Sequence, residues 1–86
     1  MVNKHLIKQF GLKIRELREA KNISQEALSF STGFHRTYIG MIERGERNIS
    51  LTNMAVFAKV FELSLSELLD YKTLNSFRKY ETKNQK

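Results

Sequence analysis

The chain has 86 residues, room for one domain, and carries 15 basic against 9 acidic side chains. It has no cysteine, no proline and only four glycines, which excludes disulfide scaffolds and thiolate metal sites and disfavours a turn-rich β protein. No apolar run reaches the length of a membrane span, and the N-terminus lacks the apolar segment of a signal peptide, so a basic, all-α, cytoplasmic domain is expected. Its charge favours nucleic acid or an anionic membrane surface as the partner.

The first two predicted helices span residues 4–21 and about 25–32. In the first, apolar residues recur at the spacing of one helical face, while lysine and arginine occupy the other faces. Ser24 is placed to cap the second helix, and Gly33 is placed to end it with a positive φ. The inward side chains of the first helix are expected to be Phe10, Ile14 and Leu17.

A third predicted helix spans about residues 36–44, follows Phe34 and ends at Gly45. Ile39 and Ile42 are expected to point inward from it. Two short helices joined by a tight turn form the pattern of a helix-turn-helix, in which the second helix enters the DNA major groove.

The fourth predicted helix spans about residues 51–61, and a capping box of Ser64 and Glu67 predicts a fifth. Glu62 stands between them, where a left-handed helix end favours glycine. Apolar residues then recur every three positions from Tyr71, which predicts a sixth helix or a tail. The expected architecture is a five-helix, all-α domain over residues 1–71 with a basic extension over residues 72–86.

Several short segments, in this order, resemble one family: LKIRELR at 12–18, ISQEAL at 23–28 and IERG at 42–45. Over about residues 6–70 the chain resembles the lambda-repressor-like (Cro/repressor, XRE-type) helix-turn-helix regulators. HRTYI at 35–39 and ERGERNI at 43–49 are especially similar to controller proteins of restriction–modification systems. The resemblance implies a sequence-specific transcription regulator that binds a pseudo-palindromic operator as a homodimer, with RNA polymerase as a further candidate partner.

The resemblance also implies roles for residues that match the family's DNA contacts. The start of the third helix would read bases, and arginine is suited to bidentate recognition of guanine. Met41 offers an apolar surface to a thymine methyl group, while Gly40 departs from the usual serine and would let the backbone approach DNA. The remaining positions would contact phosphates. The expected DNA-binding residues are Gln25, His35, Arg36, Thr37, Tyr38, Gly40, Met41, Arg44, Arg47 and Asn48.

Each of these residues also has a purely structural interpretation. The arginines could be solvated surface charges, Tyr38 could pack between helices, and Gln25 could be a polar residue at a helix start. His35 could cap the third helix or contact a phosphate. No metal site is expected from two distant histidines without cysteine, and no cofactor or catalytic group is expected.

Two further predictions concern architecture. By resemblance, Arg18 and Glu43 form an ion pair between the first helix and the recognition helix. Residues 51–71 combine apolar side chains with one lysine against three acidic residues, and a single small core should not leave such a surface exposed. The expected dimer interface consists of Phe61, Leu65, Leu69 and Tyr71.

Two other functions remain open from the sequence. An antitoxin would bind DNA and also inhibit a partner toxin, for which residues 71–86 offer the extra surface. An amphipathic protein on an anionic membrane would use the same basic charge, but it does not require the ordered helix-turn-helix pattern.

Overall fold

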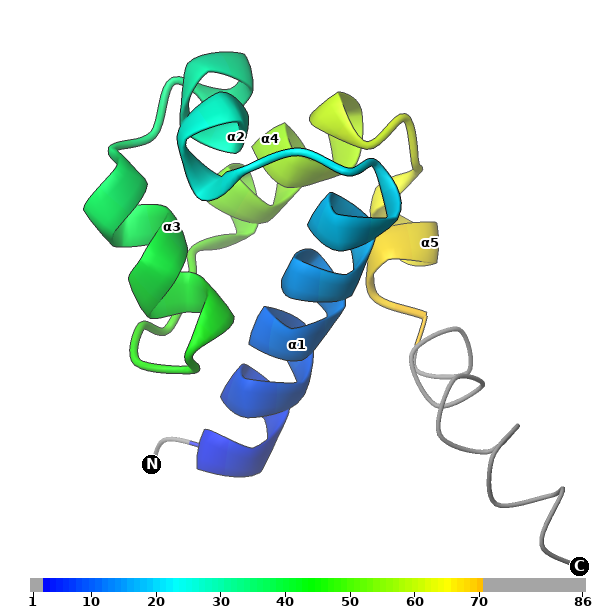
Figure 1. The fold of residues 1–86 in the computed structure, drawn as a ribbon. Coiled ribbons are helices and arrows are strands. Elements are labelled where there is room, and N and C mark those ends of the chain that lie inside the picture. Colours follow the sequence, from blue (N-terminus) through cyan, green and yellow to red (C-terminus); the bar gives the residue numbers. More distant parts are fainter. Residues whose placement is uncertain (1–2, 71–86) are drawn as a thin grey trace, which may run out of the picture.

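The computed structural model describes residues 3–70, which form five α-helices and no strand (Figure 1). This confirms the predicted all-α fold, with each helix within one or two residues of its expected bounds. The sixth helix or tail expected from Tyr71, and the extension 72–86, lie outside the described residues. The helices are α1 (Lys4–Ala20), α2 (Gln25–Thr32), α3 (Arg36–Glu43), α4 (Leu51–Val60) and α5 (Leu65–Leu68).

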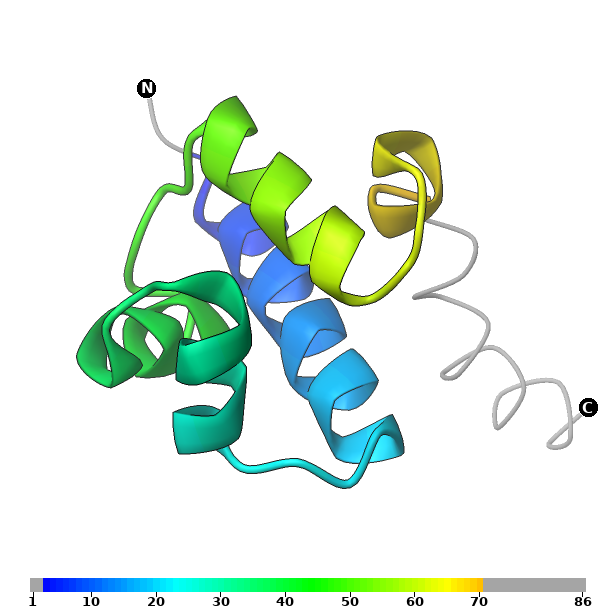
Figure 2. The same cartoon turned by 90° about the horizontal axis from the view of Figure 1, so that it is seen from above.

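The long helix α1 runs through the domain, with α2 and α3 along one side of it and α5 along the other (Figures 1 and 2). Helix α3 packs against both α1 and α2, and α4 packs against α2 and α5. This arrangement leaves one long side of α3 facing outward. Within residues 3–70, no helix is long and apolar enough to cross a bilayer.

Every described helix begins with a polar side chain that accepts a hydrogen bond from a backbone N–H of the first turn. In the capping box before α5, the Ser64 hydroxyl accepts from the Glu67 N–H at 3.0 Å, while the Glu67 carboxylate accepts from the Ser64 N–H at 2.8 Å. These bonds satisfy amide groups that have no partner inside the helix. The caps predicted at Ser24, Ser50 and Ser64 are confirmed.

Glu62 adopts a left-handed conformation with φ of +60°, as its position after α4 indicates. The turn keeps its normal hydrogen bonds, because the Leu63 N–H donates to the Ala58 carbonyl at 2.8 Å. A residue other than glycine is therefore accommodated here, at the energetic cost of its Cβ in that conformation.

The core draws on α1 to α5. Its fully buried side chains include Ile14 and Leu28 as well as Ile39 and Ile42, the two residues expected to anchor α3. Phe61 differs from the prediction: it is only 6% exposed and belongs to this core rather than to an exposed dimer surface. The physical reason is that the residue after α4 turns inward, toward Phe57 and the rest of the core, as the chain changes direction to enter α5.

Helices α1 and α3 approach each other closely at Gly11. A Cβ on Gly11 would lie 2.1 Å from the Ile42 carbonyl oxygen and 2.9 Å from that of Glu43. Both atoms belong to backbone, which cannot rotate away as a flexible side chain can. The absence of a side chain at Gly11 thus sets the distance between α1 and the end of α3.

Lys13 joins α1 to the end of α5. It is 3% exposed, and its Nζ donates to the Glu67 carbonyl oxygen at 2.9 Å. Burial lowers the pKa of Lys13, although nearby carboxylates, Asp70 foremost, oppose that shift. The ammonium group satisfies one of the carbonyls that a helix leaves without a partner at its C-terminal end.

Candidate nucleic-acid interface

The turn between α2 and α3 is held by side chains as well as backbone. Gly33 ends α2 with φ of +81°, a conformation that costs glycine little. The Ser29 hydroxyl donates to the Phe34 carbonyl oxygen at 2.6 Å, and the Phe34 N–H donates to the Thr32 hydroxyl oxygen at 3.1 Å. These bonds define the angle at which α3 leaves α2.

Helix α3 buries one face and exposes the other near its N-terminus. Ile39 and Ile42 are 0% and 1% exposed, whereas Arg36 and Thr37 are exposed. His35 is the N-cap, and its Nδ1 accepts from the Thr37 N–H at 3.1 Å. The capping role considered for His35 is therefore present, and its contact with phosphate remains a prediction.

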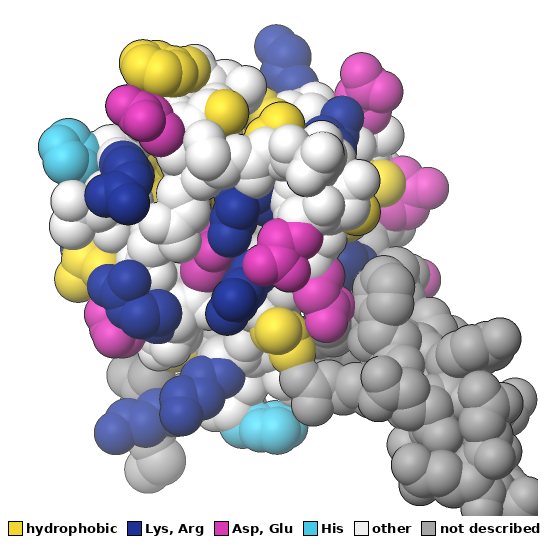
Figure 3. All heavy atoms as spheres, in the orientation of Figure 1, with side chains coloured by type: hydrophobic (Ala, Val, Ile, Leu, Met, Phe, Trp, Pro, Cys, Tyr) yellow, Lys and Arg dark blue, Asp and Glu magenta, His cyan; other side chains and the backbone are white. Residues whose placement is uncertain are grey.

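Basic side chains gather along the edge over α3 and the start of α1 (Figure 3). In α3 the exposed basic residue is Arg36, with Arg44 directly after the helix, and in α1 Lys4 and Lys8 are exposed. The loop after α3 lies against α1, because a Cβ on Gly45 would be 2.9 Å from the Lys8 Cα atom. Sequence reasoning did not single out Lys8, since nothing in the spacing of α1 indicates what lies beside it.

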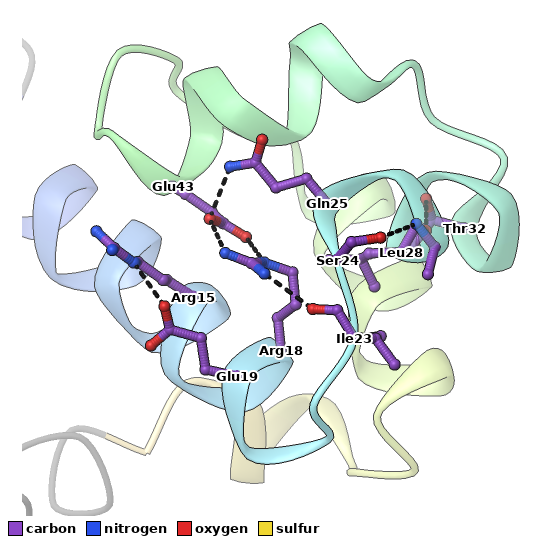
Figure 4. A network of polar contacts seen from close by, with 10 residues as sticks. Arg15, Arg18, Glu19, Ile23, Ser24, Gln25, Leu28, Thr32 and Glu43 are labelled. Carbon is purple, nitrogen blue, oxygen red and sulfur yellow. Dashed lines mark hydrogen bonds and ion pairs between the residues drawn. The ribbon is translucent and has the colours of Figure 1, made fainter.

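Arg18, Glu43 and Gln25 form a hydrogen-bonded network that joins three helices (Figure 4). Arg18 donates through Nε and through Nη2 to the two Glu43 carboxylate oxygens, at 2.7 and 3.0 Å. Its Nη1 donates to the Ile23 carbonyl oxygen at 2.9 Å. The two side chains are 12% and 3% exposed, and the hydrogen bonds to Glu43 raise the pKa of Arg18. The structure thus brings together the pair that the resemblance implied.

Two predicted DNA contacts have unexpected surroundings. The Gln25 amide nitrogen donates to the Glu43 carboxylate at 3.1 Å, so Gln25 belongs to this network, and its contact with phosphate remains a prediction. Gly40 was expected to face outward, but it is buried. A Cβ there would lie 3.1 Å from Arg44 Nη1 and 3.7 Å from the Gln25 amide oxygen, because these side chains close over the space that glycine leaves.

Tyr38 links the recognition helix to α4 and to the following loop. Its hydroxyl accepts from the Asn53 amide at 3.0 Å, and its ring packs edge-on against Phe34 at 5.2 Å between centroids. The Arg47 guanidinium lies over the same ring, 5.2 Å from its centroid. This stacking is favourable because the ring face is electron-rich. Tyr38 therefore has the packing role considered for it and also positions the exposed Arg47.

Arg44 forms a bidentate ion pair with Glu46, a residue that sequence reasoning did not select. Nε of Arg44 donates to one carboxylate oxygen at 3.1 Å and Nη2 to the other at 3.2 Å. The side chains are 57% and 50% exposed. These bonds raise the pKa of Arg44 and lower that of Glu46.

The remaining predicted residues lie at two separate places. Met41 is half-buried on α3, and Asn48 is exposed in the loop before α4. Leu65 is half-buried, whereas Leu69, directly after α5, is 46% exposed. An apolar hollow of about 260 Å³ lies beside Leu69, lined also by Leu6 and Phe10 of α1. Tyr71 lies outside the described residues.

Known proteins share both the sequence and the fold. The helix-turn-helix family matches residues 14–68. Control protein C.BamHI of Bacillus amyloliquefaciens is 46% identical over 68 residues, covering 78% of this chain and 84% of that protein. Control protein C.SmaI of Serratia marcescens is 45% identical over 56 residues, covering 65% of this chain and 67% of that protein.

Two solved structures of restriction–modification controller proteins are similar in fold. C.AhdI from Aeromonas hydrophila superimposes with a TM-score of 0.70 at 44% identity, covering 77% of this chain and 98% of that one. C.Esp1396I has a TM-score of 0.66 at 31% identity, covering 74% of this chain and 86% of that one. With its helix-turn-helix and exposed α3, the chain belongs to the helix-turn-helix family of DNA-binding transcription regulators and, within it, is similar to the restriction–modification controller proteins.

Proposed function

We propose that the chain is a transcription regulator that binds a pseudo-palindromic operator as a homodimer and controls restriction–modification genes. The similarity to control proteins C.BamHI and C.SmaI supports the biological role. No described feature points to inhibition of a toxin or to attachment to a membrane. The regulator is therefore the function that we carry forward.

The observation that carries this proposal is the exposed N-terminal end of α3. Arg36 and Thr37 project from a helix whose opposite face is held by Ile39 and Ile42. The major groove admits one helix, and base edges are read by residues near the N-terminus of such a helix. Because α3 is anchored to both α1 and α2, its exposed residues have a defined direction relative to the rest of the domain.

A dimer follows from what a single domain leaves uncovered. Leu6 is 51% exposed and Leu69 is 46% exposed, and both line the apolar hollow between α1 and the end of α5. A second copy packed on this surface would remove both side chains from water. Two-fold symmetry would then place two recognition helices about 34 Å apart, one turn of DNA.

Replacing Arg36 with alanine is expected to weaken binding to the operator by about 1–3 kcal/mol, the contribution of a bidentate contact to one base. The loss should be concentrated at one base pair per half-site, where the preference among the four bases disappears. Binding-site selection on wild type and on Arg36→Ala measures both effects.

The matched control is Arg36→Lys, which keeps the positive charge but not the planar pair of donors. Base reading by Arg36 requires that Arg36→Lys also relax the preference at that base pair. If all three proteins select the same consensus, Arg36 is not a base reader, and Thr37 and Met41 are the remaining candidates on α3.

Replacing Leu69 with glutamate is expected to convert the dimer to a monomer, because a carboxylate would be placed in an apolar interface. Helix content should be retained, since the side chain is exposed in the single domain. Sedimentation at micromolar concentration measures the change. The control is Phe30→Glu on α2, which is 81% exposed and lies away from α5 (Figure 1). A wild type that sediments as a monomer both alone and on DNA would refute the dimer.

A further inference from the structure

Arg44 is not presented to DNA as an isolated cation. Its guanidinium is occupied by the Glu46 carboxylate through two hydrogen bonds of 3.1 and 3.2 Å. A carboxylate and a phosphate offer a guanidinium the same pair of acceptor oxygens, and arginine binds either one in this bidentate fashion. The Glu46 carboxylate therefore stands where a DNA phosphate would have to bind.

The surroundings of Arg44 fit this folded-back position. Its Nη1 would lie only 3.1 Å from a Cβ on residue 40, so a larger residue in place of Gly40 would press on the guanidinium. The side chain thus lies against the recognition helix rather than extending from it. Glu46 follows the left-handed Gly45, whose N–H donates to the Ile42 carbonyl oxygen at 3.0 Å, and its own N–H donates to the Met41 carbonyl oxygen at 2.8 Å. These bonds hold the backbone of Glu46 next to the end of α3.

We propose that Glu46 is a specificity determinant, which occupies Arg44 as an internal substitute for phosphate and releases it only on a well-fitted DNA site. This inference rests on the proposed DNA-binding function and assigns a role to an acidic residue within its basic surface. On a random duplex, a phosphate contact of Arg44 would only replace the contact with Glu46, so the net gain is small. On the operator, base contacts seat α3 in the groove, and the better-placed DNA partner displaces the carboxylate.

The substitution Glu46→Gln removes the competing charge with little change in size. It should raise affinity for a scrambled duplex about fivefold, the upper range for an exposed ion pair, and affinity for the operator less than twofold. The ratio of specific to non-specific affinity should therefore fall. The dependence of scrambled-duplex binding on salt should steepen by about 0.9 in log–log slope, the value for one added phosphate contact.

A double-mutant cycle with Arg44→Ala separates this role from a general effect of charge. With Glu46 present, Arg44→Ala should change affinity for the scrambled duplex less than twofold, because Arg44 is already occupied. On the Glu46→Gln background, the same substitution should cost about fivefold, since the released guanidinium then contributes a phosphate contact. A purely electrostatic effect of residue 46 predicts equal gains with and without Arg44.

The control variant is Glu19→Gln, which breaks the Arg15–Glu19 pair of 3.1 Å and similar exposure on α1. It adds the same net charge and should leave affinity for the scrambled duplex nearly unchanged. Equal gains on operator and scrambled duplex, a gain independent of Arg44, or an equal gain from Glu19→Gln would each overturn the role of Glu46. A wild type that selects no DNA sequence would instead refute the proposed function itself, so the two failures are distinguishable.

Discussion

Replacing Glu43 with alanine is expected to lower the free energy of unfolding by about 3–5 kcal/mol, the loss typical when one partner of a buried ion pair is removed. The Glu43 side chain is 3% exposed and accepts hydrogen bonds from both Arg18 and Gln25. Its removal leaves a guanidinium that is 12% exposed without its carboxylate. Urea unfolding followed by circular dichroism, at one fixed protein concentration, measures the change.

Two controls test the origin of that loss. Glu19→Ala breaks the Arg15–Glu19 pair, whose side chains are 58% and 53% exposed, and should cost less than about 1 kcal/mol. The double substitution Arg18→Met with Glu43→Leu removes both charges and should restore most of the stability, because no charge then stays buried. If Glu43→Ala is no more destabilising than Glu19→Ala, the network does not hold α1, α2 and α3 together.

Replacing Gly11 with alanine is expected to destabilise the fold by about 1–3 kcal/mol, the usual cost of an overpacked core. Its new Cβ would meet the Ile42 carbonyl oxygen at 2.1 Å, so α1 and α3 would have to separate. Because α3 would move with respect to α1, operator binding should weaken as well. Thermal unfolding and operator affinity, measured on the same preparation, test both effects.

The matched control is the other helical glycine that faces a neighbour, Gly40. There a Cβ meets only the Arg44 and Gln25 side chains, at 3.1 and 3.7 Å, and these can move. Gly40→Ala should therefore be stabilising by about 0.5–1 kcal/mol, since alanine restricts the unfolded chain and favours helix. Equal effects of the two substitutions would show that helix propensity, and not contact between α1 and α3, dominates at Gly11.

Local signals in the sequence were sufficient to predict the helices and their ends. Ser24, Ser50 and Ser64 each provide a hydroxyl that only the adjacent N–H groups can reach, so their capping role depends on a few neighbouring residues. The inward positions of Ile39 and Ile42 follow in the same way from helical spacing. The helix-turn-helix could be predicted for this reason, and the exposed start of α3 could be predicted with it.

The tertiary structure alone decided which partner each polar group has and which helices come closest. The contact of Gly11 with α3, the burial of Phe61 and the hydrogen bond from Lys13 to Glu67 each join segments that are far apart in the sequence or depend on how the chain turns. Even the nearby pair of Arg44 and Glu46 depends on the direction in which Gly45 sends the chain. The sequence by itself determined the elements and the exposed start of the recognition helix, because caps and helical spacing act over a few residues. The relative placement of the helices decided which charges are paired, because side chains several residues or several helices apart meet only after packing.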